Sequence, residues 1–146
     1  MRLDLSKNAQ CSFIFHSYPK LFPLLEQHLG ISRDRIVSPL ALEAITLPPA
    51  VKNDAFITRI KRSLESDQIA FDKTARIEAS LGNGYRDALK LRHGELGRVT
   101  DMVLYPRSHD QVQKIVTLAC EYDVCLIPVG SGNNAVGSIT PLDSDS

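Results

Sequence analysis

The sequence contains no tryptophan, has few aromatic residues and carries no excess of charge of either sign. Its 17 basic residues balance 17 acidic residues, which argues against a nucleic acid as the partner. No apolar run approaches the ~18 residues of a membrane-spanning helix, so we expect no transmembrane segment. What remains is a chain of 146 residues, 43% hydrophobic and 23% charged, and these values are ordinary for a globular protein.

Cysteine is scarce, with only Cys11, Cys120 and Cys125 in the chain. Their odd number argues against a disulfide framework, and their spacing fits no metal-ligand pattern, so we predict no metal site. Cys120 and Cys125 are expected to serve packing. The amino terminus lacks the apolar core of a secretory signal, and the carboxyl terminus lacks a peroxisomal tripeptide. We therefore expect a cytoplasmic protein.

Apolar residues at helical spacing predict several helices in the first two thirds of the chain. The first predicted helix is 21–29, which Gly30 ends. A second helix is predicted to start at the cap Asn53 and to bury the stripe Phe56, Ile57, Ile60 and Leu64. Two more helices are predicted at 73–80, capped by Asp72, and at 85–91, after the break at Gly82-Asn83-Gly84. Pro39, Pro48 and Pro49 predict an irregular path before the second helix.

A strand, a helix and a second strand are predicted in close succession from Asp101 onward. Residues 102–105 form a short apolar run that Pro106 ends, and residues 108–111 (SHDQ) have the form of a capping box. The helix that follows is predicted to place Val112, Ile115, Val116, Ala119 and Tyr122 on one face. Residues 124–129 then form an apolar run typical of a buried strand. Such a βαβ unit has parallel strands joined by a right-handed crossover, and ligands bind beyond the carboxyl ends of its strands.

A glycine-rich loop, Gly130-Ser131-Gly132-Asn133-Asn134-Ala135-Val136-Gly137, follows the second predicted strand. Successive backbone N–H groups of such a turn can hold a phosphate. The glycine spacing misses the dinucleotide fingerprint, and no Gly-Lys-Ser/Thr sequence is present, so we expect neither a Rossmann site nor a nucleotide-hydrolase loop. On the pattern alone, an anion cradle and a plain turn without a ligand are equally supported.

Several short segments in the second half of the chain occur in a characteristic order. They are Leu91-Arg92-His93-Gly94-Glu95, Asp101-Met102-Val103-Leu104-Tyr105-Pro106, His109-Asp110-x-Val112-x-Lys114-Ile115-Val116, Ala119-Cys120 and Pro128-Val129-Gly130-Ser131-Gly132-Asn133-Asn134. In this order they resemble the start of the PCMH-type flavin domain of FAD-linked oxidases of the vanillyl-alcohol-oxidase type. Within that family the chain is most similar to the alkyldihydroxyacetonephosphate-synthase branch, including its bacterial members. The proline-rich stretch 39–49 resembles that branch as well, so the resemblance extends from about Leu25 onward.

The resemblance implies an α+β fold: residues 71–146 form the amino-terminal part of a PCMH-type FAD-binding domain, and residues 1–70 form a helical leader. It also implies that Pro128, Val129, Gly130, Ser131, Gly132, Asn133, Asn134 and Ala135 bind the FAD pyrophosphate. Some relatives attach FAD through a histidine in this loop, and none lies between Pro128 and Ser138. We therefore expect noncovalent FAD. Ser131 stands where the family has glycine, which would cost about 1 kcal/mol at positive φ and weaken binding.

The resemblance further implies an enzyme of ether-lipid synthesis that exchanges the acyl group of acyl-dihydroxyacetone phosphate for a fatty alcohol. No position matches the family's catalytic residues, so we assign none and expect this chain alone, as an amino-terminal fragment, to be inactive. The alternatives are a non-enzymatic remnant or protein-interaction domain, and a fragment of a FAD-linked hydroxy-acid oxidase.

Three further residues and one strand edge complete the predictions. His93 and Glu95 could act in acid–base chemistry, although a surface role is favoured. Arg92 fits either a phosphate contact or an ion pair with Glu95. The strand predicted at 124–129 would leave an unpaired edge, so we expect self-association.

Overall fold

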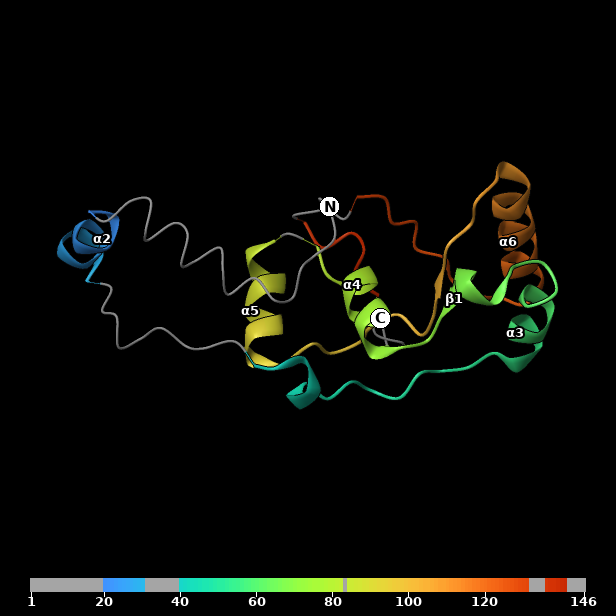
Figure 1. Ribbon diagram of the computed structural model, residues 1–146, viewed down its shortest axis with the longest axis horizontal. Helices are drawn as coiled ribbons and strands as arrows, with labels where there is room; N and C mark the ends of the chain where they lie inside the picture. The colour runs from blue at the N-terminus through green and yellow to red at the C-terminus, as the bar shows by residue number, and fades with distance from the viewer. Residues whose placement is uncertain (1–19, 31–39, 83, 132–135, 142–146) are drawn as a thin grey trace.

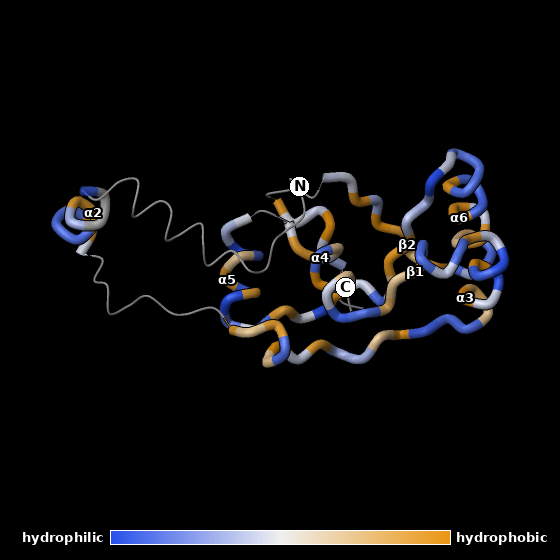
Figure 2. The backbone as a smooth tube through the Cα atoms, viewed as in Figure 1, coloured by the Kyte–Doolittle hydropathy of each residue, from blue (hydrophilic) through white to orange (hydrophobic). Residues whose placement is uncertain are grey.

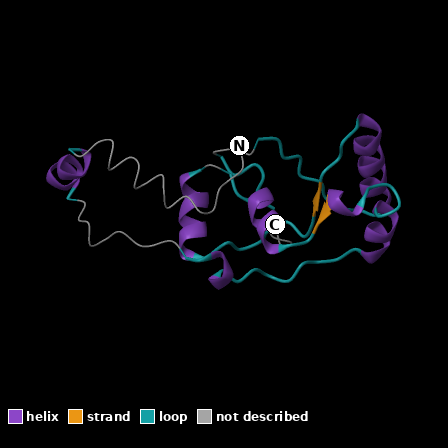
Figure 3. Cartoon of the chain, viewed as in Figure 1, coloured by secondary structure: helices purple, strands orange, loops and turns teal. Residues whose placement is uncertain are grey.

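The computed structural model describes residues 20–30, 40–82, 84–131 and 136–141. The elements follow in the order α2 (Leu21–Leu29), η2 (Leu42–Ala44), α3 (Asp54–Ile60), η3 (Ser66–Gln68), β1 (Ile69–Ala70), α4 (Lys73–Ser80), α5 (Tyr85–His93), β2 (Val103–Leu104) and α6 (His109–Glu121). The described fold is therefore mostly helical, with one small two-stranded sheet (Figure 3). None of the described helices is long and apolar enough to cross a membrane.

The predicted starts of α3 and α4 and the predicted end of α2 are confirmed by their caps, whereas α3 ends earlier, at Ile60, and α5 ends later, at His93, than predicted. The side chain of Asn53 accepts a hydrogen bond from the Phe56 amide at 3.0 Å, and Asp72 accepts one from the Ala75 amide at the same distance. These side chains replace the carbonyl acceptors that the first turn of a helix lacks. At the other end of α2, Gly30 adopts a left-handed φ of 62° and donates its amide to the Glu26 carbonyl. Local sequence signals thus set where these helices begin and end.

Half of the predicted capping box forms at the start of α6. The Ser108 hydroxyl accepts a hydrogen bond from the Gln111 amide at 3.3 Å. The Gln111 side chain does not return to Ser108; its Oε1 instead accepts from the Arg107 amide at 2.7 Å and from Gln68 Nε2 at 2.9 Å. The first turn of α6 is therefore tied to η3, in a part of the chain far from it in sequence.

The sheet differs from the predicted parallel unit. β2 pairs with β1 in antiparallel fashion, with Ile69 opposite Leu104 and Ala70 opposite Val103. Residues 124–129, predicted to be a strand, form an irregular segment, and no described segment pairs with them in a ladder of hydrogen bonds. The predicted second strand and the parallel crossover are therefore wrong for the described part of the chain.

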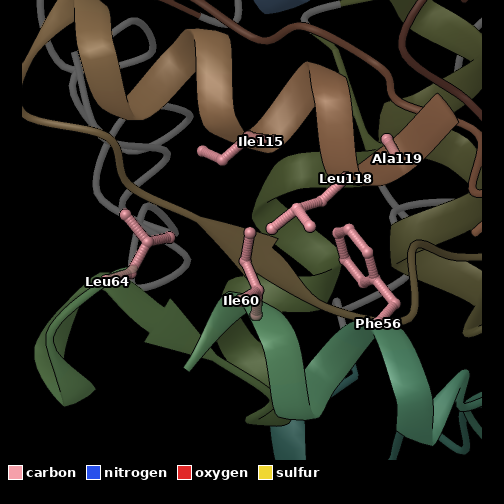
Figure 4. Packing of buried hydrophobic residues seen from close by; sticks show 6 residues of the cluster. All are labelled: Phe56, Ile60, Leu64, Ile115, Leu118 and Ala119. Atoms are coloured by element: carbon pink, nitrogen blue, oxygen red, sulfur yellow. The ribbon is translucent and has the colours of Figure 1, made fainter. Parts of the chain in front are cut away.

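The first hydrophobic cluster lies between α3 and α6 (Figure 4). Its buried residues are Phe56, Ile60, Leu64, Ile115, Leu118 and Ala119. Phe56 and Ile60 confirm the predicted stripe of α3, whereas Ile57 is half-buried and Leu64 is buried from the turn beyond the end of the helix. The Tyr122 ring stands edge-on to the Phe56 ring, with 6.5 Å between their centroids. The cluster joins a helix of the predicted leader to a helix of the predicted flavin domain; the boundary at residues 70 and 71 stays a prediction.

The second hydrophobic cluster surrounds α4. It comprises Ile45, Ile77, Leu81, Leu96 and Val99. Hydrophobic segments gather around α4, at the sheet and between α3 and α6 (Figure 2). α2 lies apart from the other elements and exposes Leu24 and Leu29 (Figure 1). Ile69 and Leu104 of the sheet, and Val124 before the glycine-rich loop, pack against the first cluster.

Candidate functional site

The end of α6 fixes the direction in which the chain enters the loop. The Tyr122 amide donates to the Leu118 carbonyl at 3.0 Å, and the Val124 amide donates to the Ala119 carbonyl at 2.8 Å. Asp123 adopts a left-handed φ of 52°, and the bond from Val124 to Ala119 that encloses it is the 6→1 bond of a Schellman turn. Val124 then packs against the first hydrophobic cluster. The chain that leads to the loop therefore starts from a defined position.

The described residues of the predicted pyrophosphate site, Pro128, Val129, Gly130 and Ser131, are all exposed. A Cβ built on Gly130 would meet no atom within 4 Å, so the backbone there is open to solvent. Neither Gly130 nor Ser131 has a positive φ, so the strain considered for Ser131 is absent in this conformation. The other four predicted site residues, Gly132, Asn133, Asn134 and Ala135, lie outside the described residues.

The chain beyond the loop is anchored to the end of α4. Gly137 has a φ of 81°, and its carbonyl accepts a hydrogen bond from the Thr140 amide at 3.1 Å, which closes a turn. The Thr140 hydroxyl donates to the Ser80 carbonyl at 3.4 Å, and Ile139 is buried. The segment between Val124 and Gly137 is therefore attached to the first cluster at one end and to α4 at the other.

A buried polar cluster on α4 supports this anchor, and sequence reasoning missed it. Ser80 is fully buried; its hydroxyl accepts from the Thr100 amide and donates to the Arg76 carbonyl, each at 2.8 Å. The buried Arg76 donates Nε–H to the Thr100 carbonyl at 2.7 Å and Nη2–H to the Pro48 carbonyl at 3.2 Å. The sequence offers no signal for these bonds, because serine and arginine on a helix usually face solvent.

The remaining candidate residues form no catalytic cluster in the described part of the chain. His93 and Glu95 are both exposed at the end of α5. Among the ion pairs of the described residues, none joins Arg92 to Glu95. Cys120 and Cys125 are free and exposed, so the packing that we expect of them is not seen among the described residues. No group of histidine, cysteine or acidic residues in the described ranges could hold a metal ion.

Comparison with protein families identifies the kind of segment that surrounds the loop. Residues 100–144 match the family described as "FAD binding domain". The matched range begins at Thr100, whose amide is bound by Ser80, and runs through β2, α6 and the loop. This part of the chain is therefore similar to FAD-binding domains, as the resemblance predicted.

Among the similar proteins are alkyldihydroxyacetonephosphate synthases from three organisms. The Dictyostelium discoideum synthase is 35% identical over 106 residues, which cover 73% of this chain and 17% of the relative. The Trypanosoma brucei brucei synthase is 37% identical over 95 residues, covering 65% of this chain and 16% of the relative. The Caenorhabditis elegans synthase is 28% identical over 129 residues, covering 87% and 21%. The chain thus spans about a fifth of the length of these relatives.

The fold is similar to solved structures of the same enzyme. One structure of alkyldihydroxyacetonephosphate synthase superposes with a TM-score of 0.75 at 30% sequence identity, covering 87% of this chain and 24% of that chain. A second structure gives the same TM-score at 31% identity, covering 86% and 24%. Together with the sequence matches, these similarities confirm the predicted resemblance to the alkyldihydroxyacetonephosphate-synthase branch of FAD-linked oxidases.

Proposed function

We propose that this chain is the part of an alkyldihydroxyacetonephosphate-synthase-like flavoprotein that binds the FAD pyrophosphate noncovalently. The proposed site is the loop from Pro128 to Ala135. The observation that carries the proposal is the match of residues 100–144 to FAD-binding domains, within a fold similar to the solved synthases. The full-length protein would act in ether-lipid synthesis in the cytoplasm, replacing an acyl group by a fatty alcohol. The 146 residues alone would have no turnover.

The chemistry of the described loop residues suits a diphosphate. Among the described residues, the amides of Gly130 and Ser131 donate to no other group, so both can donate to an anion. Charge-assisted bonds from backbone N–H groups hold phosphate without a cationic side chain, which fits a chain of zero net charge. Bound FAD would supply the redox-active flavin ring. The part played by this chain is to hold the pyrophosphate.

Substitution of Gly130 by alanine tests the site. In the ligand-free chain the added Cβ meets nothing within 4 Å, and the φ of Gly130 suits alanine, so folding should be unaffected. A diphosphate lying against the backbone would collide with that methyl group. We expect the chain to quench FAD fluorescence, ADP to compete, and Gly130→Ala to weaken binding by about ten-fold, or about 1.4 kcal/mol.

The matched control is Gln113→Ala, an exposed position on the polar face of α6, which should leave FAD binding unchanged. FAD at 100 times its dissociation constant should also stabilise the fold by about 2.7 kcal/mol. A melting temperature that saturating FAD does not move, or equal quenching by wild type and Gly130→Ala, would contradict the proposed site. An unmoved melting temperature would favour the non-enzymatic alternative.

A further inference from the structure

The side chain of Asn53 makes two hydrogen bonds, one with each end of its amide. Oδ1 accepts from the Phe56 amide at 3.0 Å and caps α3. Nδ2 donates at 3.0 Å to the carbonyl of Tyr122, which lies 69 residues further along the chain. Capping needs only an acceptor, and aspartate would supply it with a charge that also suits the start of a helix. The bond to Tyr122 needs an N–H donor, which asparagine has and aspartate lacks.

The Tyr122 carbonyl belongs to the peptide group that leads from the end of α6 into Asp123. The last carbonyls of a helix have no partner within the helix. Here the Ala119 carbonyl accepts from the Val124 amide, and the Tyr122 carbonyl accepts from Asn53. Because a peptide group is planar, the bond that holds the Tyr122 carbonyl also holds the amide of Asp123, whose φ is 52°. A left-handed φ is unfavourable for a residue with a side chain, so this turn depends on the bonds around it.

We infer that Asn53 is a positioning residue for the pyrophosphate loop and acts through the Tyr122 carbonyl. The inference rests on the proposed function, and it gives a part in that function to a residue outside the range 100–144 that matches FAD-binding domains. Asn53 holds the peptide group at which the chain turns, and Val124 then packs against the first hydrophobic cluster. The direction in which the chain leaves toward Gly130 is therefore set in part from the predicted leader.

The other contact between the same two elements does not hold this peptide group. The Phe56 ring stands edge-on to the Tyr122 ring, with 6.5 Å between their centroids. The plane of a peptide group can rotate about the line between its two Cα atoms while both Cα atoms, and the side chains on them, stay in place. Loss of the Nδ2 donor should thus loosen the turn at Asp123 without separating α3 from α6.

Substitution of Asn53 by aspartate separates the two hydrogen bonds. The carboxylate still caps α3, but it donates nothing and places a negative oxygen beside the Tyr122 carbonyl. Amide hydrogen exchange measured by NMR follows each bond by itself. In Asn53→Asp the Val124 amide should exchange at least about five times faster, which is the effect of one ordinary hydrogen bond on an equilibrium. The Phe56 amide should keep its wild-type rate.

The matched control is Asp72→Asn, the reverse exchange at the cap of α4, where the side chain accepts from the Ala75 amide. It should leave the exchange of Val124 unchanged. In titrations of FAD fluorescence, Asn53→Asp should raise the Kd by about five-fold and Asp72→Asn should not. Both variants should be folded in buffer by circular dichroism, so that a change in affinity does not come from unfolding.

The outcomes separate this inference from the proposed function. If the wild-type chain binds FAD and Asn53→Asp binds it equally well, the inference is overturned and the FAD site stands. If the wild-type chain binds no FAD while Asn53→Asp accelerates exchange at Val124, the proposed function is contradicted and the hold of Asn53 on the turn is supported. Asn53→Ser, a shorter uncharged cap, should repeat the pattern of Asn53→Asp. Equal acceleration at Phe56 and Val124 in both variants would reduce Asn53 to a helix cap and overturn the inference.

Discussion

The buried side chain of Gln68 offers the sharpest test of how the fold is held together. Gln68 is 1% exposed, and its amide uses all four of its hydrogen-bonding positions. Nε2 donates to the Tyr105 carbonyl at 2.7 Å and to Gln111 Oε1 at 2.9 Å. Oε1 accepts from the Glu65 amide at 3.1 Å and from Gln111 Nε2 at 3.2 Å. One side chain thus connects η3, the end of β2 and the start of α6.

Two substitutions of Gln68 separate hydrogen bonding from packing. Gln68→Met keeps most of the volume and removes four hydrogen bonds worth about 1 kcal/mol each, partly offset because Gln111 can turn to water. We expect a loss of about 2–3 kcal/mol in the free energy of unfolding. Gln68→Ala also leaves a cavity and should cost about 1 kcal/mol more. Such losses are a large share of the stability of a chain this size.

Urea unfolding followed by circular dichroism measures both losses. Gln113→Ala, an exposed glutamine on α6, is the control and should change stability by less than about 0.5 kcal/mol. Combining Gln68→Ala with Gln111→Ala should give a coupling energy of about 0.5–3 kcal/mol, because the two amides bind each other. If the free energy of unfolding of Gln68→Met lies within about 0.5 kcal/mol of the wild-type value, the four hydrogen bonds do not stabilise the fold.

Three further substitutions test the turn at Asp123 and the core between α3 and α6. Asp123→Gly should raise the free energy of unfolding by about 0.5–1 kcal/mol in thermal melts, because glycine adopts the left-handed φ of 52° without strain; a destabilised variant would mean that the carboxylate makes a contact the fold needs. Ile60→Ala, at a fully buried position between α3 and α6, should cost about 2–5 kcal/mol in urea unfolding. Val116→Ala, at a half-exposed position of α6, should cost less than about 1 kcal/mol, and similar losses for Ile60→Ala and Val116→Ala would contradict the assigned core.

The parts of the fold that depend on neighbouring residues could be predicted from the sequence. Asn53, Asp72 and Ser108 cap helices because each side chain reaches an amide three residues away. The buried stripe of α3 follows in the same way from the helical spacing of Phe56 and Ile60. These features require no knowledge of what lies across the molecule, and the structure confirms them.

The pairing of the sheet could not be predicted in this way. β1 is only Ile69–Ala70, too short to show the alternation that marks a strand. Residues 124–129 carry a stronger strand pattern, yet no described segment pairs with them. A strand needs a partner to complete its hydrogen bonds, and the presence of that partner is a property of the fold, not of the run itself. The expected self-association of this segment stays a prediction.

The candidate site rests on its glycines and on the ordered segments before it; the match to FAD-binding domains supports the resemblance, and the residues of the site stay a prediction. The buried polar side chains that hold the neighbouring segments in place were not predicted. Ser80 and Gln68 are buried because they bond to groups far away in sequence, Thr100 and Tyr105 among them. A polar side chain looks the same in a sequence whether it meets water or a distant carbonyl, so only the tertiary structure distinguishes the two.

The anchoring of the loop at both ends has a consequence for ligand affinity. The Schellman turn at Asp123 and the bond from Thr140 to Ser80 fix the span of the intervening segment before any ligand arrives. A free chain loses conformational entropy when its two ends are brought to such a span. In the folded chain this entropy is already lost on folding, so ligand binding does not have to offset it. The proposed site therefore predicts that a free peptide with the sequence of residues 124–137 binds a diphosphate more weakly than the folded chain, in which both ends of the segment are held.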